Sequence, residues 1–415
     1  MDAATLALGA IAGFTRKRVL SGTHRALAEE ETLRRLQPLL ADFGITRVAN
    51  ITGLDDIGIP TVVVTRPASR SLSVSQGKGL SLAAAKVSGI MESIEQHCAE
   101  RVSLPLKLGS YSERLAQGHI VDVTQLPSYI RAFDACERTL WVDATSVRTG
   151  NTVEVPFELV HLDLRLPLPS GSGFWPIGSN GLSSGNCLPE AIAHGVWELI
   201  ERDAVALFYQ RPVLDQAERR LQLDSIDGNA ALLLQRFERA GVGVALWDVT
   251  TDVGVAAYFC SIVEKELEPF RPVGMARGFG CHGDRQVAVC RALTEAAQSR
   301  LTRISGSRDD LQKADFGALR EPENIALHQR QLAEPQSRPF SAAPNMRFET
   351  FEEDLRWLLE RLRASGLDDI LYVDLSAEGM PFHVVRVIIP GLEGAPDVPG
   401  YVAGKRAQTV AQGAT

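Results

Sequence analysis

Three stretches of this 415-residue sequence place pairs of oxygen-bearing side chains three residues apart. The stretches align without gaps and cover residues 84–96, 190–202 and 287–299. Their pairs are Glu92 with Glu95, Glu198 with Glu201, and Glu295 with Gln298, and the small residues three positions before the first member are Gly89, Gly195 and Ala292. Side chains three residues apart share one face of an α-helix, so each pair presents two oxygens in the same direction. The small residues allow another backbone or a ligand to come close.

Two interpretations of these carboxylates are open. Glutamate pairs at this spacing are frequent on solvated helix faces, and any single pair is accounted for in that way. If the three faces converge, their four carboxylates repel one another unless cations neutralise them. Mg²⁺ prefers oxygen ligands and often links one or two carboxylates to substrate phosphates. A glycine-containing loop is expected before each helix (SQGKGL, SSGNCL and GFGCHGD), and a helix N-terminus behind such a loop suits phosphate.

Three basic residues accompany the carboxylates. Lys78 lies in the SQGKG segment, Arg202 directly follows Glu201, and Arg300 comes two residues after Gln298. Each alone is typical of a surface cation, but beside the carboxylates each becomes a candidate to bind phosphate. No segment matches G-x-x-x-x-G-K-[ST], so a P-loop is excluded. The convergent interpretation therefore predicts a site for Mg²⁺ and a nucleotide of an unusual kind.

The hydrophobic periodicity predicts alternating helices and strands that would position these side chains. Helices are expected at residues 29–42, 80–100, 190–202, 225–240, 284–303 and 349–365, and strands at 60–67, 139–147, 152–166, 242–249, 253–264, 369–376 and 383–392. Residues 305–346 are polar and proline-containing, which indicates a loop-rich insertion. Residues 403–415 are expected to be frayed. The mixture predicts an α/β fold of the mixed α+β kind.

The composition excludes several classes of function. A net charge of −8 and a pI near 5.6 argue against binding to nucleic acid or to an anionic membrane. No apolar run is long enough to cross a membrane, and the N-terminal basic residues follow the apolar stretch, which is the wrong order for a secretory signal. The six cysteines form no C-x-x-C pair, which argues against a zinc site or a disulfide framework. A cytoplasmic location is expected.

Five motifs resemble, in their order along the chain, the ATP- and Mg-binding motifs of the YcaO family. They are S-V-S-Q-G-K-G-L, S-x-x-x-E-x-x-E beginning at Ser88, N-G-L-S-S-G-N-x-x-x-E containing Asn186 and Glu190, E-L-I-E-R-D, and E-x-x-Q-x-R beginning at Glu295. The resemblance covers residues 65–395. It implies the YcaO fold, in which an internal pseudo-repeat of mixed sheets and helices surrounds an acidic Mg–ATP site.

The resemblance also implies a reaction and a set of site residues. YcaO proteins use ATP to phosphorylate the oxygen of a peptide-backbone amide, after or together with attack by a nucleophile. The implied Mg²⁺ ligands are Glu92, Glu95, Glu198 and Glu201. The implied nucleotide contacts are Lys78, Ser88, Asn186, Glu190, Arg202, Glu295, Gln298 and Arg300. Glu198, Glu201 and Arg202 are the implied catalytic residues.

Segments near the two ends of the chain resemble or differ from subgroups that use different nucleophiles, and they therefore indicate which nucleophile to expect. Azoline-forming members resemble one another in a C-terminal P-x-P-x-P, whereas this chain ends GKRAQTVAQGAT. Residues 21–60, SGTHRALAEEETLRRLQPLLADFGITRVANITGLDDIGIP, look like the subgroup found with TfuA-type partners. That subgroup installs thioamides, so the resemblance implies a peptide or protein substrate, a sulfur source and a TfuA-like partner, and it allows a homodimer. Azoline formation, a nucleotide-binding scaffold without turnover and a small-molecule kinase stay as alternatives.

The predicted organisation is a subgroup-specific segment at 1–64, a YcaO domain at 65–400 that includes the insertion at 305–346, and a flexible tail at 401–415. Three further residues invite a role. Cys187, at a helix N-terminus, could carry sulfur, although a small filler beside the nucleotide is the preferred interpretation. His194 lies on the acidic stripe and is interpreted as a hydrogen-bonded structural residue. For Trp175, a substrate-facing loop and ordinary packing are equally open.

Overall fold

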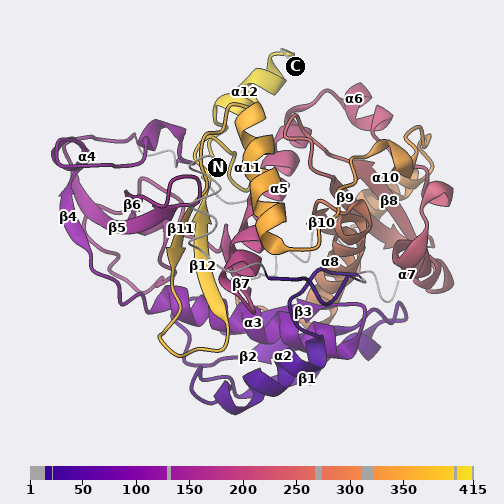
Figure 1. Ribbon diagram of the computed structural model, residues 1–415. Coiled ribbons are helices and arrows are strands. Elements are labelled where there is room, and N and C mark those ends of the chain that lie inside the picture. The colour runs from indigo at the N-terminus through magenta and orange to yellow at the C-terminus, as the bar shows by residue number, and fades with distance from the viewer. Residues whose placement is uncertain are drawn as a thin grey trace. The chain divides into compact units, whose positions relative to one another are not determined.

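The structure is a computed structural model that describes residues 15–20, 22–128, 132–266, 273–310, 321–396 and 400–413 (Figure 1). The chain forms two compact units, each assembled from several segments. The first unit comprises Met1–Arg18, Ile94–Arg211 and Phe348–Thr415, and the second comprises Val19–Ser93 and Pro212–Arg347. Each unit therefore combines chain segments that are far apart in the sequence.

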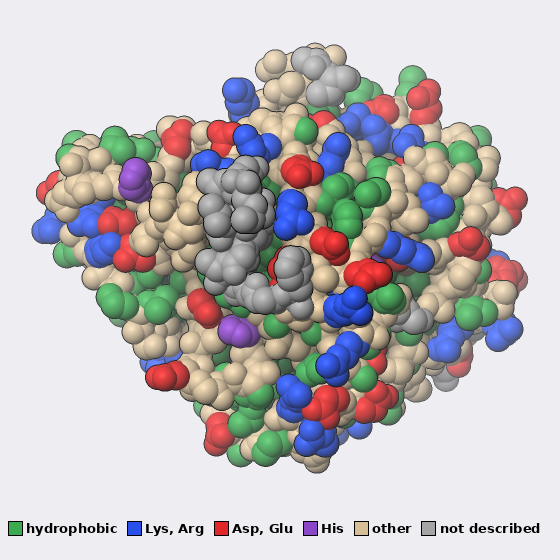
Figure 2. Space-filling view, in the orientation of Figure 1, with side chains coloured by type: hydrophobic (Ala, Val, Ile, Leu, Met, Phe, Trp, Pro, Cys, Tyr) green, Lys and Arg blue, Asp and Glu red, His purple; other side chains and the backbone are tan. Residues whose placement is uncertain are grey.

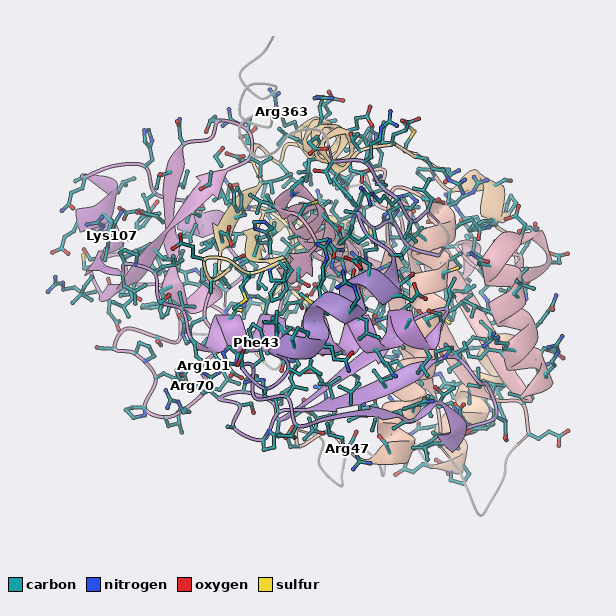
Figure 3. All side chains as sticks on the ribbon, turned by 60° about the horizontal axis from the view of Figure 1, so that its bottom comes forward. Phe43, Arg47, Arg70, Arg101, Lys107 and Arg363 are labelled. Atoms are coloured by element: carbon teal, nitrogen blue, oxygen red, sulfur yellow. The ribbon has the colours of Figure 1, made fainter. Side chains whose placement is uncertain are left out.

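An antiparallel sheet organises the first unit. Its strands follow the order β4 (Lys107–Ser110), β5 (Arg138–Ser146), β11 (Leu371–Asp374), β12 (His383–Ile388) and β7 (Leu182–Gly185), and β6 (Thr152–Pro156) pairs with β5. Trp141 and Trp175 pack with their ring centroids 6.0 Å apart in the apolar core against this sheet. Lys107 on β4 (Figure 3) donates hydrogen bonds to Asp143 and Glu154, at 2.5 and 2.9 Å.

Helices pack on one end of this sheet. They are α5 (Leu188–Gln210), α11 (Phe351–Ala364) and α12 (Lys405–Ala411), and the short elements of the unit are α4 (Tyr111–Leu115), η3 (Val123–Gln125) and η4 (Phe157–Leu159). Helix α5 packs on β7 and β12, and α11 and α12 pack on α5. Gly195 lies at the contact with the sheet, where a Cβ would be 2.6 Å from Cγ2 of Val387 and 2.7 Å from Oγ of Ser183.

The second unit contains two three-stranded antiparallel sheets. One has the order β1 (Arg47–Asn50), β2 (Thr61–Thr65) and β3 (Val74–Lys78), and the other has the order β10 (Ala276–Cys281), β9 (Ala257–Glu264) and β8 (Val242–Asp248). Strand β2 reads TVVVT and is almost wholly buried, as a β-branched run should be. Arg47 on β1 is labelled in Figure 3.

Two long helices contribute to the second unit. Helix α8 (Arg285–Ser305) packs on β10 and also contacts β2 and β3, and α3 (Leu82–Glu100) begins in this unit and ends in the first. The shorter helices are α2 (Glu29–Leu36), α6 (Val213–Glu218), α7 (Gly228–Arg239) and α10 (Pro322–Leu332), with single turns η1 (Gln37–Leu39), η2 (Thr52–Leu54), η5 (Leu223–Ser225) and η6 (Phe340–Ala342). Asp284 caps α8 by accepting a hydrogen bond from the Gln286 nitrogen, at 2.9 Å.

Three strands lead directly into long helices: β3 into α3, β7 into α5, and β10 into α8. Glycine sits where strand and helix meet. A Cβ on Gly77 would lie 2.0 Å from the Ala85 carbonyl oxygen and 2.2 Å from the Gly89 nitrogen. A Cβ on Gly278 would lie 2.2 Å from the Ala292 carbonyl oxygen. The small residues aligned in the sequence thus admit another backbone, and packing alone explains them.

The structure corrects several local expectations. The glycine-containing segments before the three helices are not simple loops, because at least half of each belongs to β3, β7 or β10. The strand expected at 152–166 ends at Pro156 and continues as η4. In the insertion, residues 322–332 form α10, and residues 311–320 lie outside the described part of the chain. The end expected to be frayed contains α12, whose Ala407 and Val410 are buried against Leu207.

The surface carries charges of both signs. On the face shown in Figure 2, Lys and Arg side chains lie among Asp and Glu side chains. In the part of the chain that the structure describes, no helix combines the length and the apolar character needed to cross a membrane.

Candidate active site

The first unit holds one group of the predicted site residues on and around α5. The helix begins after Cys187, with a proline in its first turn, which suits a position whose nitrogen needs no helical partner. Glu190 follows in the first turn and is 2% exposed. The Asn186 side-chain nitrogen donates to both carboxylate oxygens of Glu190, at 3.3 and 3.4 Å. An amide and a carboxylate are thereby fixed together at the positive end of the helix dipole.

Glu95 and Glu201 have partners that hold their carboxylates in place. Ser184 Oγ, at the end of β7, donates to Glu95 Oε1 at 2.5 Å, which joins the last turns of α3 to the strand before α5. Glu201 is 2% exposed, and its Oε1 lies 3.7 Å from the Arg202 guanidinium. The carboxylates are therefore oriented within the unit before any ligand arrives.

The charges of two of the carboxylates affect the pKa of Arg386, which lies on β12. Burial lowers the pKa of this arginine to about 10, whereas the charges of Glu198 and Glu95 raise it. Glu95 and Glu198 belong to different helices, yet both act on one guanidinium. Sequence reasoning missed Arg386, whose only signal was a basic residue inside the apolar strand HVVRVI.

The oxygen ligands available in this unit are of the kind by which proteins usually bind Mg²⁺. Glu95, Glu198 and Glu201 supply carboxylate oxygens, and the first two act on the same buried cation. Among the residues described here, no three His, Cys, Asp or Glu side chains are already gathered as a metal site. Mg²⁺ is commonly held by one or two carboxylates together with substrate phosphates, so a closed protein cage is not required.

The second unit holds the other group of predicted residues: Lys78, Ser88, Glu92, Glu295, Gln298 and Arg300. Lys78, the last residue of β3, forms an ion pair of 2.6 Å with Glu295 on α8. The Phe279 nitrogen on β10 donates to the other Glu295 oxygen, at 3.3 Å. Glu295 therefore joins two strands and orients the lysine, and the sequence spacing did not reveal this pairing. Ser88 and Glu92 lie on α3, four residues apart.

Arg300 is held by two acidic residues that sequence reasoning did not select. Its Nη1 donates to Glu264 Oε1 at 2.7 Å, and its Nε lies 3.6 Å from Asp55 Oδ2. Burial raises the pKa of Asp55, and the charge of Arg300 opposes that rise. Asp55 belongs to the TGLDDIG segment, and an acidic pair between two apolar runs was the available signal.

Two of the further candidates, Cys187 and Trp175, have structural roles. Burial, assisted by the charge of Glu190, raises the pKa of the Cys187 thiol to about 12, so Cys187 is a thiol and not a thiolate at neutral pH. This favours the filler interpretation of Cys187. Trp175 is 2% exposed and packs against Trp141 and Phe174, which decides for ordinary packing over a substrate-facing loop. His24 lies 3.6 Å from Asp284 and thereby fixes the SGTHR segment to the start of α8.

Comparison with known proteins places these residues in a family. Residues 76–393 match the family described as YcaO cyclodehydratase, ATP- and Mg²⁺-binding. A protein of Rhizobium leguminosarum bv. trifolii, named for its position in the tfuA 3′ region, is 37% identical over 377 residues, which cover 89% of this chain and 88% of the relative. A protein of Methanothermobacter thermautotrophicus is 36% identical over 376 residues, covering 89% of this chain and 95% of the relative.

Solved structures show the same fold. YcaO from Methanopyrus kandleri, bound with AMPPCP and Mg²⁺, superimposes with a TM-score of 0.72 at 25% identity and covers 94% of this chain and 98% of its own. A heterocyclase in complex with substrate and cofactor gives a TM-score of 0.74 at 23% identity; the match covers 92% of this chain and about half, 54%, of the heterocyclase chain. The order of the motifs, the mixed α/β fold and the extent of these matches lead to one conclusion: the chain belongs to the YcaO family of ATP- and Mg²⁺-binding proteins.

Proposed function

We propose that this protein uses ATP and Mg²⁺ to phosphorylate the oxygen of a peptide-backbone amide, with sulfide as the nucleophile and a thioamide as the product. The observation that carries the proposal is the filled set of motif residues, in the family's order, in a chain that superimposes along most of its length on a YcaO protein bound with AMPPCP and Mg²⁺. A degenerate scaffold would be free to lose some of these carboxylates and amides.

The proposed reaction exchanges one atom of the peptide. Hydrosulfide attacks the amide carbon, and the γ-phosphoryl group of ATP is transferred to the amide oxygen. The C–O bond then breaks, so the former amide oxygen leaves in hydrogen phosphate together with the proton of hydrosulfide, and a C=S bond forms. The products are a thioamide, ADP and phosphate. Phosphorylation is needed because an amide oxygen is a poor leaving group.

The residues divide into three roles in this proposal. Glu92, Glu95, Glu198 and Glu201 would hold Mg²⁺, which neutralises phosphate charge when bound. Lys78, Ser88, Asn186, Glu190, Glu295, Gln298 and Arg300 would bind and orient the nucleotide. Arg202, beside Glu201, would donate hydrogen bonds to the phosphates as negative charge moves toward the leaving oxygen. Most of the rate acceleration would come from positioning and charge neutralisation.

Two observations support sulfide as the nucleophile. Residues 21–60 resemble the subgroup found with TfuA-type partners, and the Rhizobium relative is named for the tfuA 3′ region. We therefore propose a TfuA-like partner, which would supply or deliver sulfur, and a peptide or protein substrate. The segment 1–64 would be the part specific to this subgroup and 65–400 the catalytic domain, followed by the segment that contains α12.

A second candidate is azoline formation by a Cys, Ser or Thr side chain of the substrate. The family description as a cyclodehydratase favours it, and the ATP chemistry is the same. The two reactions differ in the mass of the product.

Mass spectrometry of the treated peptide distinguishes these functions. The protein is incubated with ATP, Mg²⁺, sulfide and a candidate peptide, with and without a TfuA-like protein. A mass gain equal to the difference between sulfur and oxygen supports thioamidation, and loss of one water supports azoline formation. ATP turnover with an unmodified peptide in every combination would contradict both. Omission of sulfide is the matched control, because it removes only the thioamide product.

A further inference from the structure

Arg386 is a buried cation that forms no ion pair in the part of the chain that the structure describes. The residue lies on β12, and 1% of its surface is exposed. Nη1 donates to the Asn180 carbonyl oxygen at 2.7 Å and Nη2 to the Val160 carbonyl oxygen at 3.2 Å. Its Nε is buried and has no hydrogen-bond partner among the described residues. Both acceptors are neutral, so these contacts place the guanidinium without cancelling its charge.

The strand register brings Arg386 to the face that Glu95 contacts. In the β12–β7 pair, Arg386 lies opposite Leu182, and Val384 lies opposite Ser184. Side chains two residues apart on a strand point to the same face, so Arg386 and Ser184 share a face of the sheet on neighbouring strands. Diagonal neighbours of this kind are about 7–8 Å apart, within reach of long side chains. Ser184 Oγ donates to Glu95, which places that carboxylate over this face.

The electrostatics agree with this placement. Burial lowers the pKa of Arg386 to about 10, and the charges of Glu198 and Glu95 both oppose that effect. Two carboxylates from α5 and α3 therefore act on one guanidinium. Without a metal ion, Glu95 and Glu198 would repel each other, and a nearby buried cation offsets that repulsion because low-dielectric surroundings strengthen every charge interaction.

We propose that Arg386 is the resident counter-ion of the acidic site: the charge of its guanidinium compensates Glu95 and Glu198 while no metal is bound. This inference rests on the proposed metal role of those two glutamates. Arg386 acts on them through its charge and forms no part of the reacting groups. The same charge lowers the affinity of the carboxylates for a free divalent cation. The site would therefore take up Mg²⁺ together with a nucleotide, whose phosphates supply the missing ligands.

The test measures Mn²⁺ binding by electron paramagnetic resonance in the absence of nucleotide. Arg386→Gln removes the charge but keeps an amide donor for a carbonyl oxygen, and Arg386→Lys keeps the charge. We expect Arg386→Gln to bind Mn²⁺ on the order of tenfold more tightly than the wild type, and Arg386→Lys within about twofold. The metal-free Arg386→Gln protein should melt at a lower temperature, and Mn²⁺ should raise its melting temperature by more than it raises that of the wild type.

Arg220 provides the matched control. It is also fully buried, donates to the carbonyl oxygens of Gln331 and Leu332, and has a buried Nε without a hydrogen-bond partner among the described residues. It belongs to the second unit, where burial lowers its pKa and the charge of Glu334, not of Glu95 or Glu198, opposes that effect. Arg220→Gln should lower the melting temperature and leave the Mn²⁺ affinity of the protein unchanged.

The outcomes separate this inference from the proposed function. Binding of Mn²⁺ and AMPPCP by the wild type, with equal or weaker Mn²⁺ affinity in Arg386→Gln, overturns the counter-ion role alone. Failure of the wild type to bind Mn²⁺ with or without AMPPCP overturns the metal site and this inference with it. If Arg386→Gln does not fold, Glu198→Gln is added, since removing one carboxylate removes much of the need for a counter-ion. A double variant no more stable than Arg386→Gln also overturns the inference.

Discussion

At the scale of single residues, the carboxylates of α5 are the most direct test of the proposed chemistry. Glu198→Gln keeps the size of the side chain and removes the charge that would help to hold Mg²⁺. We expect the rate of ATP hydrolysis to fall by at least about 100-fold, because Glu198 would help to hold the Mg²⁺ that stabilises the transferring phosphate, and losing one electrostatic contribution of that kind typically costs this much. Glu360→Gln, at an exposed position of α11, is the control and should keep the wild-type rate. A wild-type rate in Glu198→Gln would contradict the metal assignment.

His161 makes the stability of the protein depend on pH. Burial lowers the pKa of His161 to about 4, and the charge of Arg386 acts in the same direction. Between about pH 6.5 and 4 His161 binds a proton in the unfolded chain but not in the folded protein, so acidification favours unfolding. We expect His161 to make the free energy of unfolding about 2 kcal/mol smaller at pH 5 than at pH 8. The measurement is urea unfolding at both pH values.

The variant His161→Gln isolates this contribution, because other groups also titrate over the same range. The amide can still accept the hydrogen bond that the Asp163 nitrogen donates to His161 Nδ1 at 3.2 Å. Its free energy of unfolding should change less between pH 8 and pH 5 than that of the wild type. Equal changes in the two proteins would show that His161 is protonated normally in the folded state.

At the scale of elements, the contact between β3 and α3 depends on the absence of one side chain. Gly77→Ala would place a Cβ 2.0 Å from the Ala85 carbonyl oxygen, and neither backbone can yield without separating strand from helix. We expect a loss of about 3 kcal/mol in the free energy of unfolding, as for severe overpacking. Gly53→Ala is the control in the same unit: its Cβ meets nothing within 4 Å, so the change should stay within about 0.5 kcal/mol. Urea unfolding of both variants decides the matter.

Helix α12 is anchored to α5 beside the proposed catalytic residues. Arg406 donates to both oxygens of Asp203, at 2.9 and 3.0 Å, and Asp203 is fully buried. Burial raises the pKa of Asp203, and the charge of Arg406 opposes that rise. Arg406→Met should therefore cost about 3 kcal/mol of stability, because it leaves a buried carboxylate without its cation. Lys405→Met, exposed on the same helix, should change the stability little.

The double variant Asp203→Asn/Arg406→Met distinguishes an uncompensated charge from lost packing. Removing the carboxylate as well should restore part of the stability that Arg406→Met loses, as measured by urea unfolding. If the double variant is less stable than Arg406→Met, the contribution of Arg406 is its packing and not its charge.

At the scale of the whole molecule, the sequence predicted the long elements well because their signals are local. The periodicity at 80–100 and 284–303 corresponds to α3 and α8, and the β-branched run at 60–67 contains β2. Strands β3 and β10 were missed because glycines replace the side chains that would mark a strand. Those glycines are needed because a helix backbone packs closely against the strand, and no local sequence pattern reveals such a tertiary contact. Helix α12 was missed because it is stabilised by Arg406 and Glu393, through contacts with distant residues.

The candidate site residues stay a prediction, and only some of their surroundings could be read from the sequence. Carboxylates and basic residues at motif positions were visible in the sequence, because their spacing is set by single helices. The groups around them were not visible, since Ser184, Asp55 and Glu264 contact the site residues from other strands and loops. Arg386, which lies on β12, is affected by Glu95 and Glu198 through their charges. A residue whose role depends on a partner far along the chain leaves no periodic signal.

Nucleotide binding by the whole molecule should require Mg²⁺. Repulsion between the carboxylates and the phosphates would keep a metal-free nucleotide away, whereas Mg²⁺ would link the two. At 100 times its Kd, AMPPCP with Mg²⁺ should stabilise the folded protein by about 2.7 kcal/mol, seen as a higher melting temperature by differential scanning fluorimetry. AMPPCP with EDTA should give almost no shift, and Mg²⁺ alone only a small one, because Arg386 weakens the hold on a free cation. An equal shift with EDTA would show that the nucleotide binds through the basic residues alone, and the carboxylates would then need another role.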